Sequence, residues 1–171
     1  MFRRFGSEVT IVQRGARLLK IEDEDVSDEV AAILRDDGIT VLTSSTPVRV
    51  ESADGAGVRL TIRTQDGERA LEGSHLLSAI GRIPNTEALT PEAAGIGLND
   101  RGFIEVDEYL QTSVPGVYAM GDVKGGPAFT HSSYDDYRIL RANLVNHEKR
   151  STRDRIVPYT VFIDPQLGRA A

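Results

Sequence analysis

The first 42 residues alternate between apolar strands and an amphipathic helix, and this order restricts the fold more than any other feature. Residues 9–12 and 39–42 are short β-branched runs, and we predict both as strands, the first buried on both faces. Four apolar residues between them fall on one face of a helix that ends at Gly38: Val26, Val30, Ile33 and Leu34. A strand, a helix and a strand in this order predict a βαβ unit and an α/β fold.

The chain then changes to the pattern of an antiparallel meander. Residues 48–52 and 58–64 flank Asp54-Gly55, a strong hairpin signal, and Asp66-Gly67 predicts a second turn of the same kind. Residues 75–80 form another apolar run, which we predict as a buried strand that ends in "GRIPN".

The second half of the chain predicts two more strands and one helix. The segments "FIEVD" and "GVYAM" are predicted strands on either side of the turn "SVPG". A helix is expected to begin near Thr130 or Ser132, with Ser132 and Asp135 as a capping box. Three residues would form its apolar stripe: Tyr137, Leu140 and Leu144.

Composition excludes several classes of function. The net charge of −6 disfavours a general binder of nucleic acid, which needs a basic face. No stretch approaches the roughly 18 apolar residues of a membrane span, so we expect a soluble, cytoplasmic protein without membrane contact. The absence of cysteine removes disulfides, thiolate zinc sites and a cysteine nucleophile from this chain. The histidines have no partners at metal-ligand spacing, so we predict no metal site.

A basic loop follows the first predicted strand. In dinucleotide-binding βαβ units, an acidic residue at the end of the second strand holds the ribose of NAD, about 20 positions after the glycine-rich loop. If residues 9–12 are that strand, the position is Gln13, and the glycine loop would precede Met1. Arg14, Arg17 and Lys20 would then favour the 2′-phosphate of NADP. A solvated basic loop without a ligand is the alternative reading.

Two glycine-containing strand ends are further candidates. Asp122 follows Gly121 at the end of "GVYAM", where ligands bind in open α/β sheets, and the next helix would aim amides near Thr130 at an electron-rich atom. Gly81 in "SAIGRIPN" allows a close backbone approach or a positive φ. An ordinary loop aspartate and an ordinary turn after a strand remain the alternatives.

Three segments together resemble one family. The segments "GSEVTIVQRGARLL", "LLSAIGRIPN" and "FIEVDEYLQTSVPGVYAMGDV", in that order and spacing, resemble the pyridine nucleotide-disulfide oxidoreductases, which include mercuric reductase and dihydrolipoamide dehydrogenase. The resemblance implies an α/β fold of partial FAD/NAD(P)-binding, Rossmann-type, three-layer domains, truncated at both ends. Residues 1–75 would be the back half of the NAD(P)-binding domain and residues 76–149 a returning segment of the FAD-binding domain. Residues 150–171 would be a linker and the first strand of the dimerisation domain.

The resemblance also implies roles for particular residues. Asp122 would hydrogen-bond the ribityl or phosphate region of FAD, Gly121 would permit the approach, and a backbone amide at Thr130 would contact the flavin ring. Gly81 would lie near the nicotinamide nucleotide. These expectations make the second half of the chain a contributor to a flavin site.

The same resemblance bears on the coenzyme. Arg14 and Lys20 fall where NADPH-dependent members of the family have two cations for the 2′-phosphate, and Gln13 departs from the acidic residue of NAD-linked members. We therefore expect NADPH rather than NADH.

The expected function is that of a fragment. The parent protein, a homodimer, would transfer hydride from NAD(P)H to FAD and on to a disulfide, a metal ion or another acceptor. The family's glycine loops and redox cysteine pair are absent from this sequence, so we predict no catalytic residue and an inactive isolated chain. The alternatives are a non-catalytic remnant and a weak nucleotide-binding module.

Overall fold

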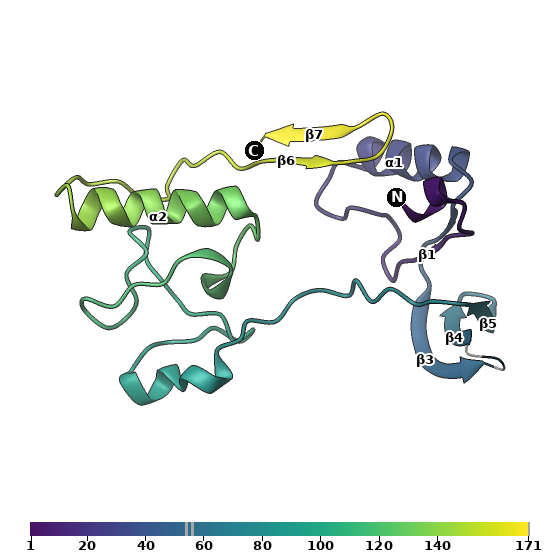
Figure 1. The fold of residues 1–171 in the computed structure, drawn as a ribbon, viewed down its shortest axis with the longest axis horizontal. Coiled ribbons are helices and arrows are strands. Elements are labelled where there is room, and N and C mark those ends of the chain that lie inside the picture. The colour runs from purple at the N-terminus through teal and green to yellow at the C-terminus, as the bar shows by residue number, and fades with distance from the viewer. Residues whose placement is uncertain (54, 56, 171) are drawn as a thin grey trace. The chain divides into compact units, whose positions relative to one another are not determined.

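The structure is a computed structural model that describes residues 1–53, 55 and 57–170. The chain divides into two compact units. The first comprises Met1–Ala79 together with Thr160–Arg169, and the second is built on Ile80–Tyr159. Figure 1 shows the elements of both in chain order.

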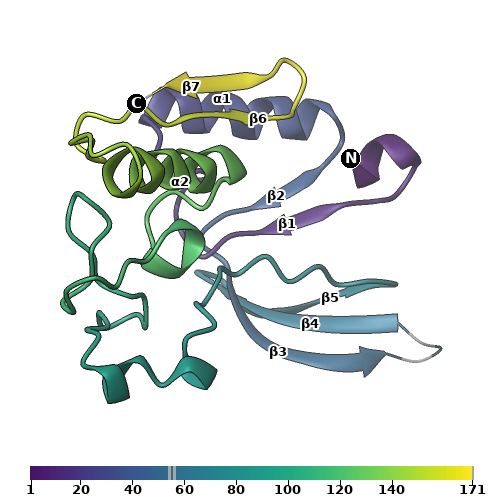
Figure 2. The ribbon, with the colours of Figure 1, turned by 60° about the vertical axis from the view of Figure 1, so that its left-hand side comes forward.

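The predicted βαβ unit is present in the first unit. Strand β1 (Thr10–Val12) pairs in parallel with β2 (Thr40–Leu42), and helix α1 (Glu24–Asp36) connects them, as Figure 2 shows. A single 3₁₀ turn, η1 (Phe2–Phe5), precedes β1. Residues 9–12 are half-buried or exposed, so the prediction of a strand buried on both faces is wrong for this chain. A parallel strand is buried on both faces only where other layers cover both sides of its sheet, and in the described residues the buried cluster with α1 packs against this two-stranded sheet.

The core of this unit lies under α1. Leu18, Val30 and Ala31 are buried together, and half-buried apolar side chains of both strands pack against them. The predicted helix face is confirmed, because Val30 is buried and the other three predicted residues are half-buried. Two residues near the C-terminus, Ile163 and Leu167, pack against the same cluster.

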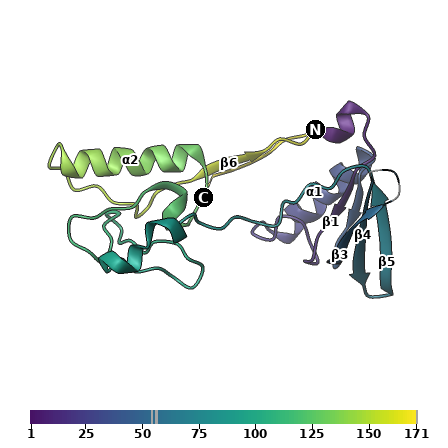
Figure 3. The same ribbon diagram turned by 60° about the horizontal axis from the view of Figure 1, so that its bottom comes forward.

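The predicted meander is confirmed as a three-stranded antiparallel sheet. Its strands are β3 (Thr46–Ala53), β4 (Gly57–Thr64) and β5 (Gly67–Gly73), which lie side by side in Figure 3. The central strand carries the buried side chains of Leu60 and Ile62. The turn at Asp66-Gly67 is present, whereas the predicted turn at Asp54-Gly55 includes Asp54, which lies outside the described residues.

Residues 75–80 do not form the predicted strand. The segment is extended, and its apolar side chains are exposed, with Leu77 at 73% and Ile80 at 90%. A strand exists only by hydrogen bonding to a neighbour, and within the described residues no strand pairs with this segment.

The second unit is mostly irregular chain around one long helix. Its elements are the 3₁₀ turns η2 (Glu87–Leu89), η3 (Pro91–Ala94) and η4 (Gly121–Lys124), and helix α2 (Thr130–Leu144). The segments "FIEVD" and "GVYAM" are not strands here. They contribute only the isolated bridges Leu98 to Ile104 and Gln111 to Tyr118.

Helix α2 begins where it was predicted, but it buries a different face. Its buried residues are Ser132, Asp136, Ile139 and Ala142. The predicted stripe is wrong at Tyr137 and Leu144, which are exposed, whereas Leu140 is half-buried. The predicted capping box is also wrong, because the N-cap is Phe129 and Ser132 lies inside the first turn.

The last two strands are β6 (Pro158–Val161) and β7 (Leu167–Ala170), which pair with each other and run in opposite directions in Figure 1. Within the part of the chain that the structure describes, no helix combines the length and the apolar character needed to cross a membrane.

Candidate functional site

The turn η4 exposes the carboxylate of Asp122 at the surface of the second unit. The chain arrives extended at Met120 and reverses at Gly121, which has a φ of 72°. A Cβ atom at Gly121 would lie 3.1 Å from Oγ of Ser133, so this glycine allows both the positive φ and the close approach to α2. The side chain of Asp122 is 43% exposed, and its Oδ2 lies 2.9 Å from Nη2 of Arg82.

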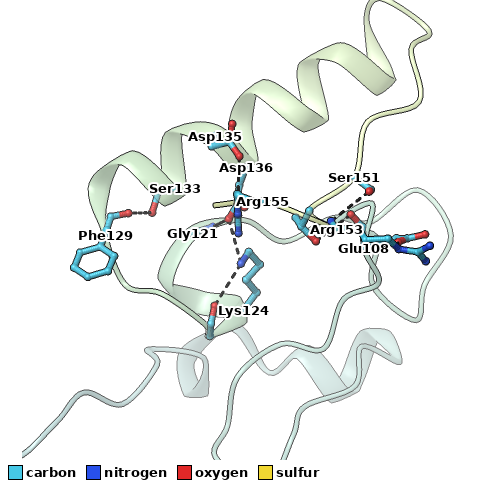
Figure 4. A network of polar contacts seen from close by, with 12 residues as sticks. Glu108, Gly121, Lys124, Phe129, Ser133, Asp135, Asp136, Ser151, Arg153 and Arg155 are labelled. Carbon is cyan, nitrogen blue, oxygen red and sulfur yellow. Dashed lines mark hydrogen bonds and ion pairs between the residues drawn. The ribbon is translucent and has the colours of Figure 1, made fainter. Parts of the chain in front are cut away.

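Asp136 anchors this turn to α2, as Figure 4 shows. Its side chain is only 1% exposed. Its Oδ2 accepts a 2.8 Å hydrogen bond from the Gly121 amide and lies 3.3 Å from Nζ of Lys124. Its Oδ1 lies 2.6 Å from Nη1 of Arg155. A buried carboxylate with two cations and a backbone donor has its charge compensated and its oxygens hydrogen-bonded.

The sequence analysis missed this cluster, which we define as Asp136, Lys124 and Arg155. The three residues are separated along the chain and join only through the fold, so no local motif identifies them. Burial alone would lower the pKa of the Arg155 guanidinium. Its hydrogen bonds and charge attraction to Asp136, and then to Asp135, outweigh that effect and raise the pKa above its usual value.

The N-terminus of α2 lies in the same unit. Thr130 is exposed in its first turn, and the first amides of any helix have no partner within the helix. Within the described residues, the buried Oγ of Ser132 has no hydrogen-bond partner either. The ring of Phe129 stacks on His131, with ring centroids 5.2 Å apart. The first amides of α2 and the Ser132 hydroxyl can donate hydrogen bonds to an electron-rich ligand atom at this end of the helix.

Gly81 is exposed and has a φ of 128°. A Cβ atom there would meet nothing within 4 Å, so the glycine is required by its backbone angle rather than by a close approach. Its neighbour Arg82 pairs with Asp122, which brings "GRIPN" and "GD" together in the second unit. No local motif in the sequence indicates this ion pair.

The predicted coenzyme residues lie at the end of β1 in the first unit. The Gln13 amide donates to the Leu42 carbonyl at 2.8 Å, so this residue continues the parallel pairing. Arg14 and Lys20 are exposed. Arg17 is engaged by α1, because its Nη1 lies 3.1 Å from Oε2 of Glu24.

A surface cavity and the possibility of a metal site provide less support for a functional site than the Asp122 turn does. A shallow cavity of about 530 Å³ lies beside residues 41–45 and 64–69 and contains none of the predicted site residues. In the described ranges, no cluster of three or more His, Cys, Asp or Glu residues could hold a metal ion.

Comparisons with known proteins connect these features to one family. A family model described as pyridine nucleotide-disulphide oxidoreductase matches residues 1–136. The probable pyridine nucleotide-disulfide oxidoreductase RclA of Escherichia coli K12 is 43% identical over 170 residues, which are 99% of this chain and 37% of that protein. A mercuric reductase of Staphylococcus aureus is 35% identical over 98% of this chain and 30% of its own length.

Solved structures agree with these matches. The HOCl-induced flavoprotein disulfide reductase RclA from Escherichia coli superposes with a TM-score of 0.86 at 42% identity, covering 99% of this chain and 38% of that one. LpdA from Mycobacterium tuberculosis has the same TM-score at 30% identity, covering 98% of this chain and 36% of its own.

The chain therefore spans about a third of the length of the relatives it matches. The predicted α/β fold, with partial Rossmann-type FAD/NAD(P)-binding domains, is confirmed. Members of this family are oxidoreductases that use FAD and NAD(P)H. The sequence motifs, the fold and the family match over residues 1–136 lead to one conclusion: this chain belongs to the pyridine nucleotide-disulfide oxidoreductase family.

Proposed function

We propose that this chain forms part of an oxidoreductase that transfers hydride from NADPH to FAD and on to a disulfide, a metal ion or another acceptor. The observation that carries the proposal is the Gly121–Lys124 turn, which exposes the Asp122 carboxylate while the buried Asp136 holds its backbone. A fixed turn with an outward carboxylate suits recognition of a polyol or ribityl chain, whose hydroxyl groups donate hydrogen bonds.

The second unit fits the flavin nucleotide. Asp122 would accept hydrogen bonds from ligand hydroxyls, and binding would replace its exposed ion pair with Arg82. The amides near Thr130, at the positive end of a 15-residue helix, would bind an electron-rich atom of the flavin ring. FAD, when bound, supplies the two-electron chemistry, and these residues bind and orient it.

The first unit fits a phosphorylated nicotinamide nucleotide. Gln13 brings no negative charge to the end of β1, so it would not repel a 2′-phosphate. The exposed Arg14 and Lys20 follow it, whereas Arg17 is paired with Glu24. We infer that Arg14 and Lys20 select NADPH. Gly81, which belongs to the second unit, would contribute near the nicotinamide through its backbone.

The domain assignment stays part of this proposal. Residues 1–75 would belong to the NAD(P)-binding domain, residues 76–149 to the FAD-binding domain, and residues 150–171 to a linker and the dimerisation domain. The expected homodimer and cytoplasmic location remain predictions. Because this chain contains no cysteine, any thiol that receives electrons would come from outside it. A non-catalytic remnant or a weak nucleotide-binding module remains the alternative function.

A chimera tests the proposal. Residues 1–171 would replace the matching segment of the Escherichia coli relative RclA, to which the chain aligns over 99% of its length. If the chain supplies working flavin and coenzyme contacts, the purified chimera retains FAD, visible in its absorption spectrum, and oxidises NADPH faster than NADH at equal, subsaturating concentrations.

The controls separate the alternatives. Asp122→Asn in the chimera should weaken FAD retention without lowering the folded fraction measured by circular dichroism. A folded chimera that retains no FAD would refute the flavin role and support the remnant. In the isolated 171-residue chain, NADPH binding without FAD binding would support the nucleotide-binding module.

A further inference from the structure

The buried carboxylate of Asp136 joins two parts of the second unit, the turn that carries Asp122 and the segment 150–157 after α2. We propose that Asp136 is a positioning residue that fixes the Gly121–Lys124 turn on α2, and that its contact with Arg155 ties this turn to the segment 150–157. The consequence for flavin binding rests on the proposed function, whereas the mechanical role does not.

Both ends of the turn are bound to one oxygen atom. The amide of Gly121, the first residue, donates to Oδ2 of Asp136 at 2.8 Å, and Nζ of Lys124, the last residue, lies 3.3 Å from the same atom. Asp122 lies between these two attachments and keeps its own carboxylate outside the cluster, paired with Arg82. The shape of the turn therefore depends on the position of Asp136, although none of the hydrogen bonds and ion pairs in the described part of the chain joins Asp136 to the Asp122 carboxylate that would meet the ligand.

The far half of the turn has a second attachment. The amide of Ile104 donates to the carbonyl of Val123 at 3.0 Å. In the hydrogen bonds of the described residues, the amide of Gly121 is bound only to Asp136. Loss of the Asp136 charge should therefore loosen the Gly121 side of the turn more than the Val123 side.

The segment after α2, which the sequence analysis described only as a linker, is held at several points. The amide of Thr152 donates to the Glu108 carbonyl at 2.8 Å, and Nε of Arg153 lies 2.8 Å from Oε2 of Glu108. Arg155 then reaches Asp136 through Nη1 at 2.6 Å, with its side chain only 14% exposed. A shift of this segment would remove one of the two countercharges of Asp136 and so reach the Asp122 turn.

Asp135 provides a matched control. It is the neighbouring carboxylate on α2, it is 38% exposed, and its Oδ2 touches Arg155 at the longer distance of 3.4 Å. Among the described contacts it has none with Gly121 or Lys124. Asp136→Asn and Asp135→Asn therefore make the same chemical change at adjacent positions, and only the first removes charge from the anchor of the turn.

The first test is amide hydrogen exchange in the full 171-residue chain, which needs no flavin. Asp136→Asn should speed exchange of the Gly121 amide roughly tenfold or more relative to the Ile139 amide in the middle of α2, because a neutral amide with one acceptor oxygen replaces the charged acceptor of the Gly121 hydrogen bond. Arg155→Met should also speed exchange of the Gly121 amide. Asp135→Asn should change the ratio of the Gly121 exchange rate to the Ile139 exchange rate by less than about twofold. Unchanged Gly121 exchange in Asp136→Asn, or an equal effect of Asp135→Asn, would overturn the proposal.

A second variant separates positioning from folding. Replacing the whole cluster by apolar side chains of similar size, Lys124→Met with Asp136→Leu and Arg155→Met, leaves no charge buried within the cluster, and such replacements are often neutral or stabilising. Asp135 also loses its contact with Arg155, but its side chain is 38% exposed and stays solvated. We expect this triple variant to keep the thermal midpoint of the wild type while the Gly121 amide exchanges faster. Wild-type exchange at Gly121 in the folded triple variant would refute the anchor.

The FAD affinity of the RclA chimera carrying the same substitutions tests the functional consequence. If the chimera without substitutions binds FAD, the dissociation constant should rise about tenfold in Asp136→Asn and stay within about twofold in Asp135→Asn. Equal affinities of the chimera without substitutions and Asp136→Asn would overturn the positioning role in flavin binding. No FAD binding by the folded chimera without substitutions would count against the proposed function, while the exchange rates would still decide whether Asp136 positions the turn.

Discussion

Reversal of the charge at Arg14 should change the choice of coenzyme. Arg14 is exposed directly after β1, and its neighbour Arg17 is already paired with Glu24 at 3.1 Å. A charge-assisted hydrogen bond to a phosphate contributes about 1.5–3 kcal/mol, and exposure to solvent favours the lower end of that range. Because about 1.4 kcal/mol corresponds to a factor of ten, Arg14→Glu should raise the KM for NADPH roughly tenfold. NADH has no 2′-phosphate, so its KM should change less than about twofold.

The assay is steady-state oxidation of NADPH and NADH by the flavin-loaded chimera, at a series of salt concentrations. The effect on NADPH should shrink as salt rises, because exposed charges are screened. Arg17→Glu is the matched control, with the same change of charge in the same loop, and we expect a smaller effect on NADPH. Equal effects of Arg14→Glu on both coenzymes, or equal effects of the two variants on NADPH, would refute a phosphate contact at Arg14.

Three further predictions concern the fold. Ile62→Ala should destabilise the chain by about 2–5 kcal/mol in urea unfolding, because this fully buried side chain fills the centre of the meander, whereas the exposed Val50 should tolerate alanine. Gly121→Ala should destabilise by at least about 1–2 kcal/mol, since φ is positive and the new Cβ would crowd Ser133. The hydrogen bond from Arg150 lowers the pKa of Glu148. This pair therefore contributes to the stability of the fold above the unfolded-state pKa, and that contribution is lost as pH falls through the folded-state pKa. An NMR titration in which Arg150→Ala leaves the pKa of Glu148 unchanged would contradict this prediction.

Much of the first unit could be predicted because its information is local. The residues on the apolar face of α1 repeat at helical spacing, and Gly38 ends that pattern. The meander was predictable for the same reason, since alternating strands and Asp-Gly turns are features of adjacent residues. The burial of the strand at residues 9–12 was not predictable, because it depends on what packs against each face of its sheet.

The face of α2 shows the limit of local patterns. The sequence suggested Tyr137 and Leu144 as core residues, yet the helix buries Ser132 and Asp136. A carboxylate can be buried without a large cost only where cations pair with it, and here those cations are Lys124 and Arg155. Hydrophobic periodicity contains no information about such partners.

The candidate site divides in the same way. Gly121, Asp122 and Gly81 were identified as candidates from motif and strand-end chemistry. Gly81 has the positive φ that the sequence analysis allowed for, whereas the positive φ of Gly121 is seen only in the structure. The ion pair between Arg82 and Asp122 required the structure, because 40 positions separate the two residues.

The sequence by itself determined the βαβ unit, the meander and the family motifs. It also determined which residue types are present to contact FAD and the nicotinamide coenzyme. Each of these depends on residues that are close in the chain, where backbone preference and spacing decide the outcome. The tertiary structure alone decided that Asp136 is buried, that it holds the Gly121 amide, and that Arg155 neutralises it. These contacts depend on the burial of charge, and the energy of a buried charge depends on partners that only the folded chain brings within hydrogen-bond distance.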